Sequence, residues 1–256
     1  IMMAAWLIQQ LTGNSGWIDT VWTFGLGSVG VVSALAPVNS DAPSSRQLLV
    51  TLLVSLWALR LGSHIALRTR HITDDPRYAA LIRKWSSDAR REMFWLLQKQ
   101  ALVSIPLAMS VFLAAQNPAP GLGGTDVLAG LVLIIAIAGE ALADHQLQVF
   151  RHDPANRGRV CDSGLWRWSR HPNYFFEWMG WLAYPLLAID FSGSYPWSWL
   201  ALLGPACMYW LLAHVSGIPP LEEHMLRSRG EAYRAYQCRT SPFFPWAPAR
   251  AERGAQ

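Results

Sequence analysis

The chain has 256 residues, of which 52% are hydrophobic and only 15% are charged, with a formal net charge of +4. Soluble domains carry about 25% charged residues, so this composition excludes an ordinary soluble domain and favours a polytopic membrane protein. The three cysteines lie far apart and form no CxxC pair, so they indicate neither a disulfide framework nor a zinc site, and we identify no metal-ligand cluster elsewhere.

Apolar segments recur along the whole chain, and most of them approach the ~20 residues that a membrane-spanning helix needs. They lie at about 1–12, 17–36, 47–66, 93–115, 125–148, 172–190 and 195–214. The first residues lack the basic start and the cleavage site of a signal peptide, so we interpret them as the tail of a first hydrophobic segment. The fourteen tryptophans gather near segment ends, which is typical of an interfacial aromatic belt. We therefore predict an all-α bundle of seven transmembrane helices that forms a single domain over residues 1–256.

Arginines are concentrated in alternate connections between these segments. The connections at about 67–92 and 149–171 and the tail at 215–256 are rich in arginine, whereas 116–124 and 191–195 contain no basic residue. Arg250 and Arg253 are among the basic residues of the tail. The positive-inside rule makes the basic connections cytoplasmic, so we expect an integral protein of a bacterial inner membrane with its N-terminus outside and its C-terminus inside. Because topology explains the arginines, nucleic-acid binding is not expected.

The second apolar segment contains a glycine motif and one acidic residue. Residues 25–30 match GxGxxG, but no strand precedes them, so we interpret the glycines as helix-packing residues rather than a dinucleotide fingerprint. Asp19 lies between Trp17 and Trp22 at the cytoplasmic end of the segment. An apolar setting can keep a carboxyl group protonated, and a protonated acid can donate a hydrogen bond to a carbonyl oxygen. The alternative is an interfacial aspartate in contact with water.

The third apolar segment places Trp57, Arg60, His64 and Arg68 on roughly one helical face. An arginine several residues inside a span is expected to face the bundle interior. The alternative, which suits Arg68 and Arg70 better, is a long side chain that reaches back to the membrane surface. In the fifth segment Glu140, Asp144 and Gln148 form a polar stripe that could bind hydroxyl or amide groups of a ligand, or could pair with neighbouring arginines.

The segment Ser169-Arg170-His171-Pro172-Asn173-Tyr174-Phe175-Phe176-Glu177-Trp178 is the most informative part of the chain. Pro172 suits the first position of a helix, and a helix from there puts Asn173, Glu177 and Gly180 on one face. Glu177 then lies about 7 Å inside the apolar layer, where an ionisable group is costly and indicates a functional site. The alternative is a carboxylate paired with an arginine for packing only.

The tail combines arginine, histidine, tyrosine and serine over residues 221–245. Leu221 to Arg227 is predicted to be helical, and Gly230 is a plausible end of that helix. These residue types suit an anionic nucleotide, because guanidinium groups bind phosphates and aromatic rings stack on bases. A solvated basic tail held at the membrane surface is the alternative.

Taken together, RHPNY followed by EEHML, RGEAYRAY and RTSPFFP resembles the membrane family of uncharacterised proteins related to steroid 5α-reductases. The stretches SLWALRLG from Ser55 and DPRY from Asp75 also fit, and the resemblance covers about residues 15–246. It implies a bundle in which cytoplasmic loops cap a pocket for NADPH. It also implies hydride transfer to the C=C bond of an enone lipid, such as a 3-oxo-Δ4-steroid, that enters from the bilayer.

The same resemblance implies roles for individual residues. Asp19 lies roughly where those reductases have a glutamate that holds the ketone oxygen, and Trp57 falls near the position of their tyrosine, although an indole N–H is a poor acid. Asn173 and Glu177 match a pair that contacts the nicotinamide. The implied cofactor-binding residues are Arg60, Arg70, Asp144, Arg170, His171, Asn173, Tyr174, Glu177, Glu223, His224, Tyr233, Tyr236, Arg239 and Ser241.

Two other functions compete with a reductase. The outline is shared with isoprenylcysteine carboxyl methyltransferases, which would make the protein a membrane methyltransferase that uses S-adenosylmethionine. The third possibility is a lipid-binding or transport protein without chemistry, which the charged residues inside the predicted spans disfavour. No protein partner is inferred from the sequence.

Overall fold

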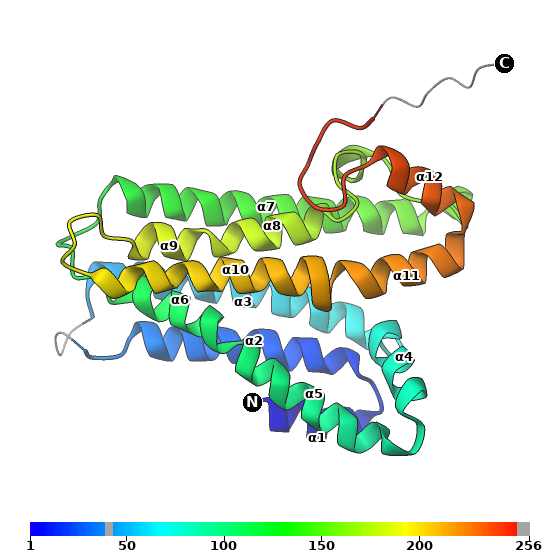
Figure 1. Ribbon diagram of the computed structural model, residues 1–256, viewed down its shortest axis with the longest axis horizontal. Helices are drawn as coiled ribbons and strands as arrows, with labels where there is room; N and C mark the ends of the chain where they lie inside the picture. The colour runs from blue at the N-terminus through cyan, green and yellow to red at the C-terminus, as the bar shows by residue number, and fades with distance from the viewer. Residues whose placement is uncertain (39–42, 250–256) are drawn as a thin grey trace. The chain divides into compact units, whose positions relative to one another are not determined.

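The computed structural model describes residues 1–38 and 43–249, and every regular element in these ranges is a helix (Figure 1). Ser169 and Ser241 form an isolated parallel bridge. The helical class that the sequence predicts is thereby confirmed. The chain divides into two compact units, of which unit 1 comprises Ile1–Gly130 and Leu182–Cys207, and unit 2 comprises Leu131–Trp181 and Met208–Gln256. Arg250 and Arg253 lie outside the described residues.

Unit 1 is built mainly from the N-terminal half of the chain. Its elements are α1 (Met2–Thr12), α2 (Gly16–Ala34), α3 (Ser45–Arg70), α4 (Pro76–Trp85), η1 (Ser86–Asp88), α5 (Ala89–Val103), α6 (Ile105–Ala115), α9 (Ala183–Ala188) and η4 (Pro196–Leu202). Local signals set the starts of two of its helices. Ser44 and Gln47 form a capping box at the start of α3, and the Asp75 side chain caps α4, in which Pro76 is the first residue.

Glycines allow α2 and α3 to pack closely. A Cβ atom on Gly27 would lie 2.3 Å from Cβ of Ala58, and one on Gly30 would lie 2.8 Å from a methyl group of Val54. Glycine has no side chain beyond a hydrogen atom, so the backbones of the two helices can approach each other at these positions. The interpretation of the GxGxxG stretch as a helix-packing motif is therefore confirmed.

Unit 2 is built around the RHPNY segment. It contains η2 (Pro154–Asn156), η3 (Gly164–Arg167), α8 (Pro172–Trp181), a π-helical turn (Leu211–Val215), α11 (Ile218–Arg229) and α12 (Glu231–Arg239). The helices α7 (Gly124–His152) and α10 (Leu203–Trp210) begin in unit 1 and end in unit 2. Helix α8 starts at Pro172 and α11 is followed by Gly230 with φ of +51°, both as predicted. Within the unit, Gly139 of α7 packs against the Phe176 ring of α8.

Four helical stretches are long and apolar enough to cross a membrane. They are Ser45–Arg70, Pro76–Ala115, Gly124–His152 and Pro196–Arg229. Two of them extend well beyond the predicted apolar segments, because the helices continue into polar sequence at Pro76–Glu92 and at Val215–Arg229. The protein therefore has the helices of a membrane protein, whereas the number of seven spans stays a prediction.

Candidate cofactor and catalytic sites

The RHPNY segment is held in place by the C-terminal tail within unit 2. The backbone N–H of Arg170 donates to the carbonyl oxygen of Ser241 at 2.8 Å, and the Ser169 hydroxyl donates to the carbonyl oxygen of Phe243 at 2.8 Å. Phe243 is buried and its ring contacts Phe175 and Trp178 of α8. Residues about 70 positions apart in sequence are thus fixed against each other at the start of α8.

Glu222 of α11 is the centre of the polar network in this region. Its carboxylate accepts hydrogen bonds from Arg170 Nε at 2.7 Å, from Gln237 Nε2 at 2.8 Å and from the Tyr233 hydroxyl at 3.3 Å. A second guanidinium nitrogen of Arg170 donates to the carbonyl oxygens of Thr240 at 2.6 Å and Gln237 at 3.1 Å. The hydrogen-bonding capacity of Arg170 is therefore largely used inside the protein.

His171 has one ring nitrogen bound and one without a partner. Its Nε2 lies 3.1 Å from the Glu222 carboxylate, whereas Nδ1 is buried and has no hydrogen-bond partner among the described residues. Burial lowers the pKa of His171, and this effect outweighs the hydrogen bond and the charge of Glu222, which raise it. Burial therefore favours the neutral ring, and with the Nε2 N–H donating a hydrogen bond to the Glu222 carboxylate, Nδ1 carries a lone pair. A buried acceptor without a donor is rare in folded proteins and marks a place where a ligand could bind.

The predicted pair Asn173 and Glu177 lies on α8. The Asn173 amide donates to Asp144 of α7 at 3.2 Å. Glu177 is buried and accepts a hydrogen bond from the Trp181 indole at 2.9 Å. The Tyr174 ring stacks on His171 with centroids 5.5 Å apart. Unit 2 therefore presents an amide and a buried carboxylate in the first two turns of α8, and the unpartnered Nδ1 atom of His171 directly before this helix.

The other predicted residues of the tail have different surroundings. Glu223 and His224 are exposed, and Glu223 pairs with Arg227. The Tyr236 hydroxyl donates to the Trp166 carbonyl oxygen, and Arg239 pairs with Asp162. Burial raises the pKa of Tyr233 and of Tyr236 well above the ordinary value for a phenol, so both stay protonated. Ser241 takes part through its backbone carbonyl oxygen.

The connection between α7 and α8 carries cations that are not paired with carboxylates. Arg157, Arg159 and Arg167 are exposed and, within the described part of the chain, none of them forms an ion pair. Arg159 contacts only the Asn156 side chain, at 3.3 Å. Unlike Arg170 and Arg239, these three guanidinium groups remain available to phosphate.

In unit 1, Asp19 is bound by an arginine and a tyrosine that precede the fourth apolar segment. One carboxylate oxygen pairs with Arg77, and the other accepts a hydrogen bond from the Tyr78 hydroxyl at 2.9 Å. Arg77 also binds both oxygens of Asp75, each at 3.0 Å. Burial raises the pKa of Asp75, but the hydrogen bonds and the charge of Arg77 lower it by more. The pKa of Asp75 is therefore below its ordinary value.

These contacts change the expected role of Asp19. Both oxygens of Asp19 already accept hydrogen bonds, from Arg77 and from Tyr78, so this side chain is better placed to accept hydrogen bonds than to donate one. Tyr78 and Arg77 were not singled out as functional residues, although both belong to the DPRY stretch. Their separation from Asp19 by 58 and 59 positions leaves no local signal for the contact.

The remaining predicted residues of unit 1 lie on α3. Trp57 is buried and packs edge-to-face on Trp22, with ring centroids 6.5 Å apart. Arg60 is half-buried, and both Arg60 and His64 take part in interactions within the protein. Arg70 is exposed. The predicted site residues therefore form one set in each unit.

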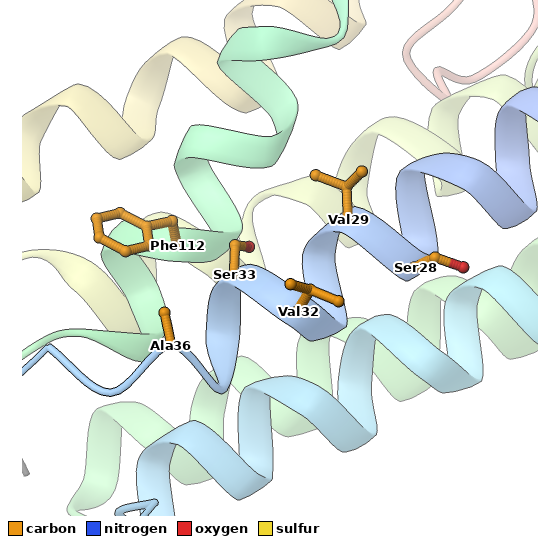
Figure 2. Close-up of a pocket in the computed structure, with 6 residues that line it drawn as sticks. All are labelled: Ser28, Val29, Val32, Ser33, Ala36 and Phe112. Atoms are coloured by element: carbon orange, nitrogen blue, oxygen red, sulfur yellow. The ribbon is translucent and has the colours of Figure 1, made fainter. Parts of the chain in front are cut away.

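A hollow of about 440 Å³ opens beside α2 and α6 in unit 1 (Figure 2). It is lined by Ser28, Val29, Val32, Ser33, Ala36 and Phe112. Both serine hydroxyls donate to carbonyl oxygens of their own helix, so their protons are not available to a ligand in the hollow. None of the predicted site residues lines it, and it carries no cofactor chemistry.

The comparisons with known proteins agree with the resemblance at the level of the family. Residues 5–240 match the family described as protein of unknown function (DUF1295). The chain belongs to this family. It is a family of the steroid 5α-reductase-like kind, which confirms the broad resemblance and leaves the activity open. The uncharacterized protein C594.04c of Schizosaccharomyces pombe (strain 972 / ATCC 24843) is 26% identical over 276 residues, covering 93% of this chain and 78% of that protein. No solved structure matches the chain.

Proposed function

We propose that this protein is a membrane-embedded reductase that uses NADPH to reduce the C=C bond of an enone lipid, such as a 3-oxo-Δ4-steroid. The observation that carries the proposal is the arrangement at the start of α8. Asn173 and the buried Glu177 lie on α8, and His171, whose buried Nδ1 lacks a donor, directly precedes this helix. Family membership supports the same function.

The residues of unit 2 suit NADPH. The lone pair of His171 Nδ1 needs a donor, and the cofactor offers ribose hydroxyls and a carboxamide N–H. The Asn173 amide and the Glu177 carboxylate suit the carboxamide group of a nicotinamide. For the phosphates we propose Arg157, Arg159 and Arg167 in place of Arg170 and Arg239, because the latter two are already paired with Glu222 and Asp162.

NADPH supplies a hydride when it is bound. The contribution of unit 1 in this proposal is a hydrogen-bond donor for the carbonyl oxygen of the substrate, on which negative charge grows during reduction. Tyr78 suits this role better than Trp57, because a phenol is a stronger acid than an indole. Asp19, which pairs with Arg77, accepts the single proton of the Tyr78 hydroxyl in the structure, so this proton would have to turn from Asp19 to the substrate oxygen when the substrate binds.

Ligand-dependent thermal unfolding of the purified protein in detergent tests the cofactor. NADPH should raise the midpoint, since a ligand at 100 times its Kd stabilises the folded state by about 2.7 kcal/mol. NADH should act more weakly if Arg157, Arg159 and Arg167 bind the 2′-phosphate, and neutralising these residues should remove that difference. A rise with S-adenosylmethionine and none with NADPH would replace the reductase by a methyltransferase.

Turnover tests the chemistry. Glu177→Gln should strongly reduce enone-dependent NADPH oxidation, whereas Glu231→Gln, which alters an exposed carboxylate on α12, should not. Tyr78→Phe should lower the rate by about 10²–10³, the usual cost of losing one donor to a developing oxyanion. A Tyr78→Phe enzyme of unchanged rate, with Asp19→Leu inactive, would return the donor role to Asp19.

A further inference from the structure

The turn between α4 and α5 carries four exposed cations that no carboxylate neutralises in an ion pair. We call this turn the basic elbow, and its cations are Arg83, Lys84, Arg90 and Arg91. In the described part of the chain none of the four forms an ion pair. The acidic residues of the turn are Asp88 and Glu92, so four positive and two negative groups leave a local charge of +2. Helix α1, which packs on α5, has no charged side chain.

Some exposed arginines elsewhere in the protein are neutralised, in contrast to those of the elbow and to Arg157, Arg159 and Arg167. On α11 and α12, Arg227 pairs with Glu223, and Arg234 pairs with Glu231 at 2.7 Å. Within the same connection as the elbow, Arg68 contacts Asp75 at 3.5 Å and Arg77 contacts Asp75 and Asp19. The connection at 67–92 therefore contains an internally neutralised part and, at the elbow, a part whose positive charge faces outward.

The length of the following helices places the elbow at the level of lipid headgroups. From Arg91 to Ala115, at the end of α6, the chain rises by about 36 Å. The hydrocarbon core of a bilayer is about 30 Å thick, and about 40–45 Å with its headgroups. When the end of α6 reaches one membrane surface, the elbow therefore reaches the other. In Figure 1 the elbow follows α4, and α5 leads away from it beside α1.

Aromatic side chains around the elbow support this depth. Trp95, one turn after Arg91, is 51% exposed, as expected of a tryptophan at a membrane interface. The guanidinium group of Arg90 lies over the Trp6 ring, 5.1 Å from its centroid, and the Trp6 indole donates to the Arg90 carbonyl oxygen at 3.2 Å. Trp6 thereby holds Arg90 at the interface, and no carboxylate neutralises the charge of this arginine in an ion pair.

We propose that the basic elbow binds anionic phospholipid headgroups, through their phosphate groups, at the membrane surface where α5 begins. Exposed, unpaired cations next to interfacial aromatics are complementary to a phosphate that carries a net negative charge. Zwitterionic lipids, in which a positive group of the headgroup offsets the charge of the phosphate, are less complementary to the basic elbow. The proposal does not depend on the reductase activity, because none of its residues belongs to the cofactor or catalytic sets.

The test compares lipid retention by the full chain in nanodiscs that contain phosphatidylcholine and phosphatidylglycerol at 3:1. The readout is the ratio of the two lipids that stay bound to the released protein in native mass spectrometry. Wild type should retain phosphatidylglycerol preferentially. Arg83→Gln/Lys84→Gln should reduce this preference by about five-fold for each charge removed, and Arg90→Gln/Arg91→Gln, an independent pair, should do the same. The preference should also weaken in 1 M salt.

The matched control removes two exposed charges that already have partners, with Arg227→Gln/Arg234→Gln. This control should keep the lipid preference of wild type. Retention of phosphatidylglycerol by both elbow variants at the wild-type level would overturn the proposal. An equal loss in the control would overturn it too, because the effect would then follow net charge rather than the elbow.

Discussion

Glu222 and Glu223 are adjacent in sequence and have opposite environments. The Glu222 side chain is 15% exposed and binds Arg170, His171, Tyr233 and Gln237. The Glu223 side chain is 64% exposed and binds only Arg227. A buried arginine that loses its carboxylate keeps an uncompensated charge, whereas an exposed ion pair contributes little. The first glutamate therefore fixes the tail against the RHPNY segment, and the second does not.

Glu222→Gln should accordingly lower the free energy of unfolding by about 3 kcal/mol, within the range for breaking a buried ion pair. Glu223→Gln, the matched control one position away, should change it by less than about 1 kcal/mol. Denaturant unfolding in detergent, followed by tryptophan fluorescence, measures both. Equal effects of the two substitutions would show that the network around Glu222 does not hold the tail.

His171 should make stability depend on pH in a specific direction. Its pKa in the folded protein is lowered from 6.5, chiefly by burial, so the unfolded chain takes up a proton at a higher pH than the folded protein does. The stabilising contribution of the neutral ring is complete above pH 6.5 and is lost as the pH falls below that value, by up to about 1.4 kcal/mol per pH unit.

Unfolding free energies at pH 7.5 and 5.5 test this linkage. The decrease from the higher to the lower pH should be smaller in His171→Gln than in wild type. His224→Gln, which alters an exposed histidine of the same unit, should keep the wild-type decrease. A His171→Gln protein with an unchanged pH dependence would assign the linkage to other groups.

At the level of elements, the close approach of α2 and α3 depends on glycine. Gly27→Ala adds a methyl group that would lie 2.3 Å from Ala58 Cβ, so the helices must separate. Overpacking of this kind costs about 1–3 kcal/mol. Gly130→Ala is the matched control in α7, because nothing lies within 4 Å of its added methyl group. There the change should be neutral or stabilising by up to about 1 kcal/mol, owing to better helix propensity.

Thermal unfolding of both variants checks this prediction. A Gly27→Ala protein as stable as Gly130→Ala would mean that α2 and α3 can move apart without loss of packing.

Local signals in the sequence predicted the ends of elements, and long-range pairing was not predictable. Pro172 and Gly230 marked helix boundaries because proline and glycine act on the backbone next to them. The contacts of Arg77 with Asp19 and of Arg170 with Glu222 join residues 58 and 52 positions apart. The sequence contained each partner, but several carboxylates were equally plausible for each arginine. For the same reason, Arg170 was expected to bind a phosphate rather than Glu222.

At the scale of the whole molecule, the number of membrane crossings is the open structural question. Four helical stretches meet the length and hydropathy of a span, whereas the pattern of apolar segments predicts seven. The deciding segment is α8 with α9, from Pro172 to Ala188. Its 17 residues extend about 25 Å, slightly less than a hydrocarbon core of about 30 Å, and it includes the buried Glu177.

Two exposed serines separate the alternatives. Ser87 lies in η1 at the basic elbow, and Ser192 lies after α9. Between them the seven-span arrangement has three crossings, 93–115, 125–148 and 172–190, which puts the serines on opposite sides of the membrane. Four spans leave two crossings between them, the part of the stretch Pro76–Ala115 that follows Ser87 and the stretch Gly124–His152, which puts both serines on one side.

We expect opposite sides, because the connection at 67–92 is rich in arginine and 191–195 contains no basic residue. The measurement uses Ser87→Cys and Ser192→Cys in a chain whose three native cysteines are replaced by serine. A membrane-impermeant maleimide should label the cysteine at 192 in right-side-out vesicles and the one at 87 in inverted vesicles. Labelling of both positions in the same type of vesicle would mean that α8 and α9 do not cross, and the predicted topology would then be wrong.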